Sequence, residues 1–225
     1  MTSQLDSLIA GLSPQRLGPY LAYSQGDYRL AMAHYHWNLR LSEALYPVLH
    51  LNEVVFRNAM HRALSTEFDT ENWFQGLWLH KREQRSIEKV IAELRKRDNE
   101  QPINPDQVVS ELTFGFWCSL CDTRYEHKQI LWPKLLRHSP LRQLPKRQRQ
   151  RKELSRAVNR LRQLRNRVFH HEPIWHWKDL PRRHTDAIEL LQWFNPEAAR
   201  VLEHTDRFNE IYQQGPTALI QELYP

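Results

Sequence analysis

The sequence has only two cysteines, Cys118 and Cys121, and no apolar run as long as a membrane span. Two cysteines do not form the disulfide framework of a small secreted domain, and a membrane-spanning helix needs about 20 consecutive, mostly apolar residues. The N-terminus has no basic segment before its short apolar part, so we predict no signal peptide. Together these absences predict a cytoplasmic protein without a membrane association.

The alternation of apolar and polar residues that predicts β-strands is also missing. Apolar residues instead recur every three or four positions, as in Leu30, Ala33, Trp37 and Leu41, which is typical of helices packed on a core. The 225 residues are 40% hydrophobic, so the chain can bury a sizeable core. We predict one all-α domain over residues 1–225, with an N-terminal helical extension at 1–25 and a core at 26–215.

Several helix starts are marked by short polar residues. Ser13, Asn104 and Asn195 each precede a proline, the combination of an N-cap and a proline at the first helical position. Asp27 is placed to cap a long helix, which Pro47 should kink or interrupt. The expected helices are residues 2–10, 14–24, 27–64, 80–97, 105–121, 146–171, 181–194 and 196–214, with a loop at 65–75 from which Trp73 and Phe74 fold back onto the core, and a polar linker at 97–105.

Basic residues are concentrated in one stretch. Residues 142–167 hold eleven Lys or Arg and one acid, Glu153, whereas the other residues hold 21 basic and 25 acidic ones. Such a run is compatible with an ordinary solvated helix face. It is also the pattern of a surface that contacts nucleic-acid phosphates. We favour the second interpretation because the run leads into a polar motif.

That motif lies in LRQLRNRVFHHEPIW, residues 161–175, which contains Arg165-Asn166 and His170-His171. Pro173 disfavours helix at the residue before it, so the helix should end near His171. Asn166 and His170 are four residues apart and therefore neighbours on the helix. Arg165 and His170 are five apart, about 140° around the axis. The two side chains of one helix therefore do not easily reach the same atom. Two copies of the helix that face each other can bring Arg165 of one copy and His170 of the other to it.

Arg165-Asn166-x-x-x-His170 resembles the R-x4-6-H motif of HEPN-domain ribonucleases, and the phrase RNRVFHHEP looks like the Abi-like (abortive-infection) branch of that superfamily. WNLRLSEALY (residues 37–46) and FGFW (114–117) are similar to the same family, so the resemblance extends over about residues 20–193. It implies an HEPN-like helical bundle with additional helices. It also implies an endoribonuclease that needs no metal or cofactor and has its active site at a homodimer interface.

The same resemblance implies a toxin-like protein of bacterial antiphage defence, acting in abortive infection and controlled by a protein or RNA antitoxin. An alternative is a non-catalytic HEPN module that docks a structured RNA without cutting it. In both cases RNA is the expected partner.

Metal-free RNA cleavage requires the 2′-hydroxyl to lose a proton and the 5′-oxygen to gain one. Histidine titrates near neutral pH and can do either, and arginine suits the charge that develops on the phosphorus. We predict that His170 acts as a general acid or phosphate ligand and that Arg165 binds the phosphate. Asn166 is predicted to hydrogen-bond the imidazole of His170 or the phosphate. The products would be a 2′,3′-cyclic phosphate and a 5′-hydroxyl. The competing interpretation is that Asn166, His170 and His171 only cap the helix.

An earlier segment, LNEVVFRNAM (residues 51–60), places Glu53 and Arg57 at the spacing of a helical ion pair. An ordinary surface salt bridge explains this equally well. HEPN ribonucleases often use a polar or acidic side chain from an earlier helix to hold the motif arginine, and the resemblance implies that Glu53 does so for Arg165. Arg57 and the adjacent Asn58 would then lie near the RNA.

Cys118 and Cys121 form one C-x-x-C pair. A structural zinc site needs four ligands, and a cysteine in so apolar a helix packs as a small hydrophobe. We therefore predict no metal site. The neighbouring FGFW run is predicted to be aromatic core and not a base-stacking platform.

The remaining expectations concern RNA contacts and assembly. We expect a homodimer in which the motif helices of two protomers face each other. Most of the phosphate contacts should come from the basic stretch. The residues predicted to contact RNA are Lys146, Arg147, Arg149, Arg151, Arg156, Arg160, Arg57, Asn58 and His171.

Overall fold

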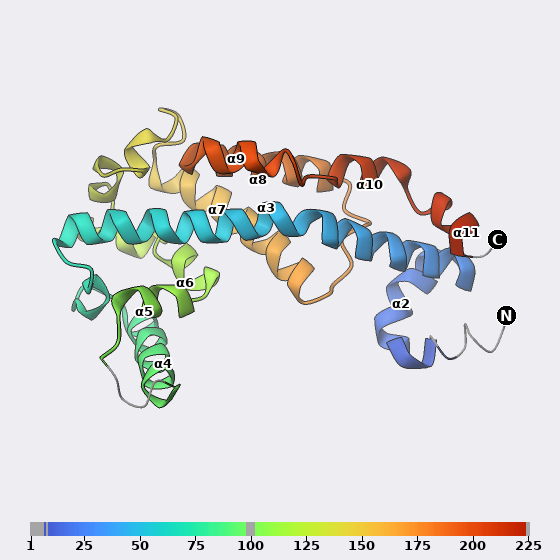
Figure 1. Ribbon diagram of the computed structural model, residues 1–225, viewed down its shortest axis with the longest axis horizontal. Helices are drawn as coiled ribbons and strands as arrows, with labels where there is room; N and C mark the ends of the chain where they lie inside the picture. Colours follow the sequence, from blue (N-terminus) through green and yellow to red (C-terminus); the bar gives the residue numbers. More distant parts are fainter. Residues whose placement is uncertain (1–6, 8, 98–101, 224–225) are drawn as a thin grey trace. The chain divides into compact units, whose positions relative to one another are not determined.

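The computed structural model describes residues 7, 9–97 and 102–223. Within these residues every regular element is a helix and no strand occurs (Figure 1), so the all-α prediction is confirmed. No helix in this part of the chain is both long and apolar enough to span a membrane. The helices are α2 (Pro14–Tyr23), α3 (Tyr28–Phe68), α4 (Lys81–Arg97), α5 (Pro105–Glu111), α6 (Phe114–Ser119), α7 (Arg151–Phe169), α8 (Leu180–Phe194), α9 (Pro196–Leu202), α10 (Phe208–Gln214) and α11 (Thr217–Leu223).

Short 3₁₀ helices connect some of these elements: η1 (Trp73–Gln75), η2 (Thr123–Tyr125), η3 (His127–Gln129), η4 (Lys134–Arg137) and η5 (Leu141–Gln143). The predicted helix at 2–10 lies largely outside the described residues, and so does the middle of the predicted linker at 97–105.

The chain divides into two compact units, each assembled from segments that are distant in sequence. The first consists of Met1–Val48, Leu164–Thr185 and Leu202–Pro225, and the second of Leu49–Gln163 and Asp186–Val201. α3, α7, α8 and α9 contribute residues to both units. That the whole chain acts as one domain stays a prediction, as does the HEPN-like arrangement of its helices.

The predicted helix starts are confirmed at the residues that carry them. The side chains of Ser13, Asn104 and Asn195 each accept a hydrogen bond from a backbone N–H two or three residues ahead. Asn104 also forms a full capping box with Gln107. Asp27 accepts two such bonds at the start of α3. These short side chains satisfy N–H groups that lack a partner within the helix.

α3 runs through Pro47, so the helix is not interrupted there, and a kink at Pro47 stays a prediction. Proline inside a helix removes a backbone hydrogen bond and costs about 3 kcal/mol. Leu45 and Val48, on either side of it, are fully buried, and burying two such side chains contributes roughly 3–6 kcal/mol. The apolar stripe therefore outweighs the local preference of proline.

Two predicted helices are each split in two. Residues 105–121 form α5 and α6, because the side chain of Thr113 accepts a hydrogen bond from the N–H of Phe116 and starts a new helix. Residues 196–214 form α9 and α10, because the Asp206 carboxylate accepts from the N–H of Phe208. In both places a short polar side chain competes with the helical backbone for its hydrogen bonds.

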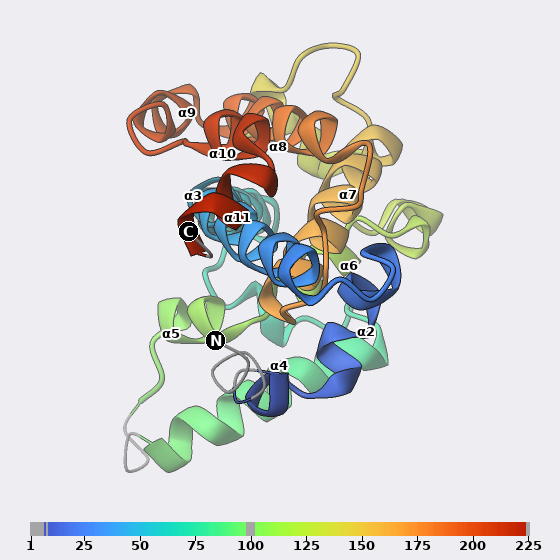
Figure 2. The same cartoon turned by 90° about the vertical axis from the view of Figure 1, so that its right-hand side faces the viewer.

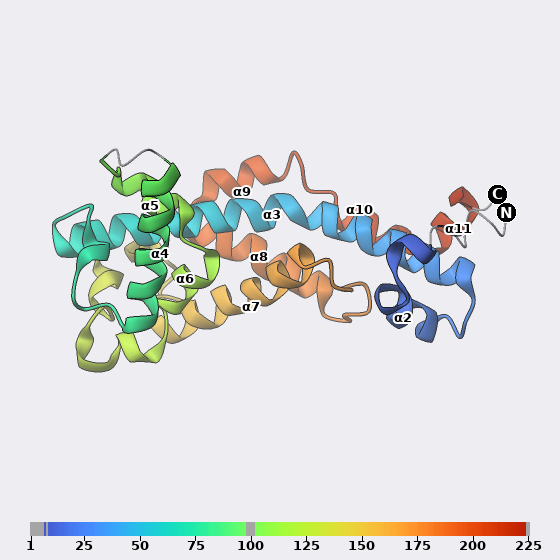
Figure 3. The same cartoon turned by 90° about the horizontal axis from the view of Figure 1, so that it is seen from below.

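The core of the second unit is aromatic. Trp73 and Phe74 are buried, as predicted for the end of the 65–75 segment, and so are Phe114, Phe116 and Trp117 of the FGFW run. Cys118 and Cys121 are buried beside them. Burial raises the pKa of the Cys121 thiol, which keeps it protonated and unreactive. α4 and α5 lie next to each other in this unit (Figure 3).

The first unit is held together around the first part of α3. The buried Asn38 side chain accepts hydrogen bonds from the N–H groups of Ile174 at 2.8 Å and Trp175 at 3.3 Å. Trp37 donates to the carbonyl of Ile211 at 2.9 Å, and α10 accordingly lies beside the first part of α3 (Figures 1 and 2). The Asn38 bonds place the segment that follows α7 against α3, and the Trp37 bond places α10 there.

Candidate active site at the end of helix α7

α7 begins at Arg151, five residues later than predicted, because residues 146–149 form a turn after Pro145. It ends at Phe169 with a Schellman closure. The N–H of His171 bonds to the carbonyl of Val168 at 3.1 Å, and the N–H of Glu172 bonds to that of Arg167 at 2.8 Å. His171 has a φ of 58°, the left-handed conformation that this closure requires.

The closure uses backbone groups alone. The side chains of Asn166, His170 and His171 make no hydrogen bond or ion pair with any described residue. Both histidines are exposed and Asn166 is half-buried. These side chains therefore do not cap the helix. The carbonyl of His171 does have a structural role, since it accepts a hydrogen bond from the Arg16 guanidinium.

Arg165 stacks on a neighbour one turn later in α7. Its guanidinium carbon lies 4.5 Å from the centre of the Phe169 ring, within the range of a cation–π interaction. The Phe169 ring, 37% exposed, lies 5.9 Å from the ring of Tyr46 on α3, which is 51% exposed. The motif arginine thus joins a small exposed aromatic cluster.

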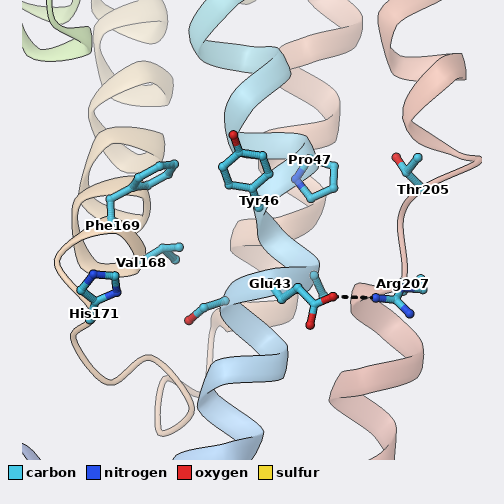
Figure 4. A pocket seen from close by; sticks show the side chains of 10 residues that line it. Glu43, Tyr46, Pro47, Val168, Phe169, His171, Thr205 and Arg207 are labelled. Carbon is cyan, nitrogen blue, oxygen red and sulfur yellow. Dashed lines mark hydrogen bonds and ion pairs between the residues drawn. The ribbon is translucent and has the colours of Figure 1, made fainter.

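A cavity of about 530 Å³ opens beside this cluster within the first unit. It is lined by residues of α3, by Phe169 at the end of α7, by His171 in the turn after α7, and by residues 205 and 207. Figure 4 shows Phe169 and Tyr46 pointing toward each other across one side of the cavity, while Glu43 and Arg207 form an ion pair at 3.0 Å. The cavity combines apolar walls with the Glu43–Arg207 ion pair and the side chain of His171.

Arg167, the second arginine of the motif phrase, is held by the fold. It forms an ion pair with Glu172 at 3.0 Å, and its guanidinium carbon lies 5.3 Å from the centre of the Trp177 ring. Partial burial and the Arg167 charge lower the pKa of His176. Arg167 therefore stabilises the turn that presents His170 and His171.

The residues predicted on the earlier helix lie in the other unit. Glu53, Arg57 and Asn58 are half-buried on α3 within the second unit, whereas Arg165 belongs to the first. Arg57 donates to the carbonyl of Ser110 at 3.1 Å. The expected contact between Glu53 and Arg165, and RNA contacts by Arg57 and Asn58, stay predictions.

Arg151 is held inside the fold. Its side chain is 11% exposed, pairs with Glu126 at 2.7 Å and donates to the carbonyl of Cys121 at 3.1 Å. A phosphate contact would have to break these bonds, so we remove Arg151 from the proposed RNA contacts.

The other basic residues of the stretch remain accessible. Lys146 and Arg147 are exposed in the turn before α7. Arg149 is half-buried and donates one hydrogen bond to the carbonyl of Arg142. Arg156 and Arg160 are paired with Glu153 and Asp186 but still reach the surface. Lys146 and Arg147 are therefore the clearest candidates for phosphate contacts.

Sequence reasoning missed the aromatic cluster and the cavity. The spacing of Arg165 and Phe169, four residues on one helix, is a usable signal for a side-chain contact. Tyr46 and Arg207 give no such signal, because they reach the site only through the packing of distant segments. No protein-family model, curated protein or solved structure matches this chain significantly.

Proposed function

We propose that this chain is a metal-independent endoribonuclease whose active site contains Arg165, Asn166 and His170. The observation that carries the proposal is that the exposed His170 side chain and the half-buried Asn166 side chain make no hydrogen bond or ion pair with any described residue. A general acid must be able to reach its substrate. Arg165, on the same helix end, supplies the positive charge that phosphoryl chemistry needs.

In this reaction the 2′-oxygen attacks the phosphorus, its proton passes to a base, and the bond to the 5′-oxygen breaks. His170 follows the last residue of α7 and its side chain is exposed, so it can reach a substrate, and histidine is the side chain most often used as a general acid. It would therefore donate the proton to the departing 5′-oxygen. Arg165 would neutralise the charge on the phosphorane, and Asn166 would orient the imidazole or the phosphate.

The site is proposed to be completed in a homodimer, since Arg165 and a residue five positions later project about 140° apart around a helix axis. Two-fold symmetry brings the same helix end of a second copy to the first, so the second chain can supply the missing acid, base or arginine. We propose that the enzyme acts as a toxin in antiphage defence and that an antitoxin controls its activity. The resemblance of residues 161–175 implies both.

The deciding experiment is RNA cleavage by purified protein in excess EDTA. We expect the wild type to degrade RNA to products with 2′,3′-cyclic phosphate ends. His170→Ala should lower the cleavage rate about 10²–10⁴-fold, the contribution of a general acid or base, and Arg165→Ala should lower it to a comparable extent. His204→Ala is the matched control, because His204 is an exposed histidine of the same unit and lies away from α7 in sequence. Full activity of folded His170→Ala would exclude the proposed role of His170.

A non-catalytic RNA-binding module is the second candidate, favoured by the exposed Lys146 and Arg147. It predicts salt-dependent RNA binding without cleavage under any condition. The same assay, read for binding as well as for products, separates the two.

A further inference from the structure

We propose that the cavity beside Tyr46 and Phe169 binds one unpaired nucleobase of the RNA strand. The inference deepens the proposed function and rests on it for the identity of the ligand. It implies that the substrate is single-stranded at the point of cleavage, because a paired base cannot present its face to a protein side chain.

The aromatic wall is the first argument. Tyr46 and Phe169 expose 51% and 37% of their surface at the edge of the cavity, although large aromatic side chains contribute most to stability when buried. Exposed rings beside positive charge are how proteins stack the bases of single strands. Arg165, 4.5 Å from the Phe169 ring centre, supplies that charge.

The size and shape of the cavity are the second argument. Its volume of about 530 Å³ lies within the usual range of 300–1,000 Å³ for small-molecule pockets, and it is formed by side chains of one unit. It is open enough to admit a base and too small for a helix of a partner protein, about 10 Å across. Figure 4 shows Phe169 and Tyr46 on one side of the cavity and the Glu43–Arg207 pair on the other.

The polar end of the cavity is the third argument. The edge of a base carries both hydrogen-bond donors and acceptors, and Glu43 and Arg207 offer one acceptor and one donor group 3.0 Å apart. Both side chains are largely exposed, and ion pairs of this kind are weak. A base edge can therefore replace the pair without a large loss of stability.

The position of the cavity connects it to the chemistry. Phe169 and His171 line it, and they are the immediate neighbours of His170 in the chain. Consecutive Cα atoms are about 3.8 Å apart, so a base held here would lie within one nucleotide of a phosphate at His170. The cavity would thus select the nucleotide next to the scissile bond.

The test measures binding, so that it does not depend on cleavage. The probe is a fluorescently labelled 2′-O-methyl RNA 12-mer, which cannot react through its 2′-oxygen, and the reference is an abasic strand with the same number of phosphates. We expect Tyr46→Leu to weaken binding of the base-containing strand at least about fivefold, the loss of roughly 1 kcal/mol of stacking. Binding of the abasic strand should not change. Tyr46→Phe should bind like the wild type.

Tyr28→Leu is the matched control, because Tyr28 is an exposed tyrosine of the same helix and does not line the cavity. Equal weakening of both strands by Tyr46→Leu, or no weakening of either, would overturn the base-binding inference. Occupation of the cavity by a second copy of the chain would appear as a change in sedimentation of Tyr46→Leu without RNA, and would also overturn it. Base-selective binding without any cleavage would instead refute the nuclease proposal and leave the base site standing.

Discussion

The guanidinium carbon of Arg165 lies 4.5 Å from the centre of the Phe169 ring, one turn further along α7. The contact fixes where the arginine points, because a flexible side chain that rests on a ring loses much of its freedom. Phe169 is itself exposed and packs against Tyr46. The arginine on which the proposed chemistry depends is thus positioned by an aromatic residue of its own helix.

We expect Phe169→Leu to lower kcat/KM for RNA cleavage by about two- to fivefold, which is the loss of roughly 0.5–1 kcal/mol of cation–π interaction at an exposed site. Phe169→Tyr keeps the aromatic face and should retain activity. Steady-state cleavage of a short RNA measures both. Tyr28→Leu, an exposed aromatic-to-leucine change elsewhere in the first unit, serves as the control. Equal activity of Phe169→Leu and the wild type would show that the ring does not position Arg165 for catalysis.

A second prediction concerns the backbone of His171. Its φ of 58° is a conformation that glycine adopts without strain and other residues adopt at a penalty. We expect His171→Gly to raise the free energy of unfolding by about 0.5–1 kcal/mol, measured by urea denaturation. His170→Gly, at a position without a positive φ, should lower stability. A destabilised His171→Gly would mean that the histidine side chain stabilises the turn.

The local parts of the fold could be predicted from the sequence, because they depend on neighbours in the chain. The caps at Ser13, Asp27 and Asn104 are of this kind, and so is the end of α7 before Pro173. Where tertiary packing decides, prediction failed. The residues next to Pro47 in the sequence do not predict that buried side chains on both sides keep α3 continuous.

For the candidate site the same limit holds. The motif residues Arg165, Asn166 and His170 could be singled out because the phrase around them resembles a family motif, and their roles stay predictions. The bond from Asn38 to the N–H of Ile174 joins residues 136 positions apart, and no local pattern predicts it. Yet such long-range bonds bring α3 to the end of α7 and so create the cavity.

A third prediction separates surface arginines from structural ones. The logarithm of the binding constant for single-stranded RNA falls linearly with the logarithm of the salt concentration. Replacing Lys146 and Arg147 together by Ala should reduce the magnitude of this slope by about 1.4, that is roughly 0.7 per phosphate contact. Arg151→Ala should leave this slope unchanged but lower the free energy of unfolding by about 1–3 kcal/mol, since Glu126 and the Cys121 carbonyl lose their donor. Arg200→Ala, an exposed arginine on α9, controls for net charge. An unchanged slope in the double variant would place the phosphate contacts elsewhere.

Stability should fall in mild acid because of His184. This histidine is buried, bonds to Asp206 at 3.1 Å and stacks on Phe208. Burial disfavours the charged imidazole. This effect is larger than the attraction of the Asp206 carboxylate, so the pKa of His184 is lowered. The native state then binds fewer protons than the unfolded state, whose histidines titrate near 6.5, so the free energy of unfolding decreases as the pH drops below about 6.5 and is constant just above it.

Urea denaturation between pH 7.5 and 5 measures this dependence. His184→Gln, which can keep a hydrogen bond but cannot be charged, should show a smaller decrease than the wild type, and His204→Gln should not differ from it. Burial also lowers the pKa of His61 and, with Arg167, that of His176, so part of the decrease should remain in His184→Gln. A stability that rises on acidification would contradict the assigned direction.

The last prediction tests the shared site. Arg165→Ala and His170→Ala are each expected to be inactive, but a heterodimer of the two would contain one site with an intact Arg165 and an intact His170 from different chains. Random mixing in equal amounts should therefore restore about a quarter of the wild-type activity, because half of the dimers are mixed and each has one of two sites intact. The eleven basic residues of 142–167 would repel across the interface, most strongly at low salt, so we expect RNA or moderate salt to favour the dimer in sedimentation. No recovery on mixing, in a dimer shown to exchange subunits, would mean that each chain holds a complete site. A cleaving protein that sediments only as a monomer would exclude the shared site and leave the roles of Arg165 and His170 intact.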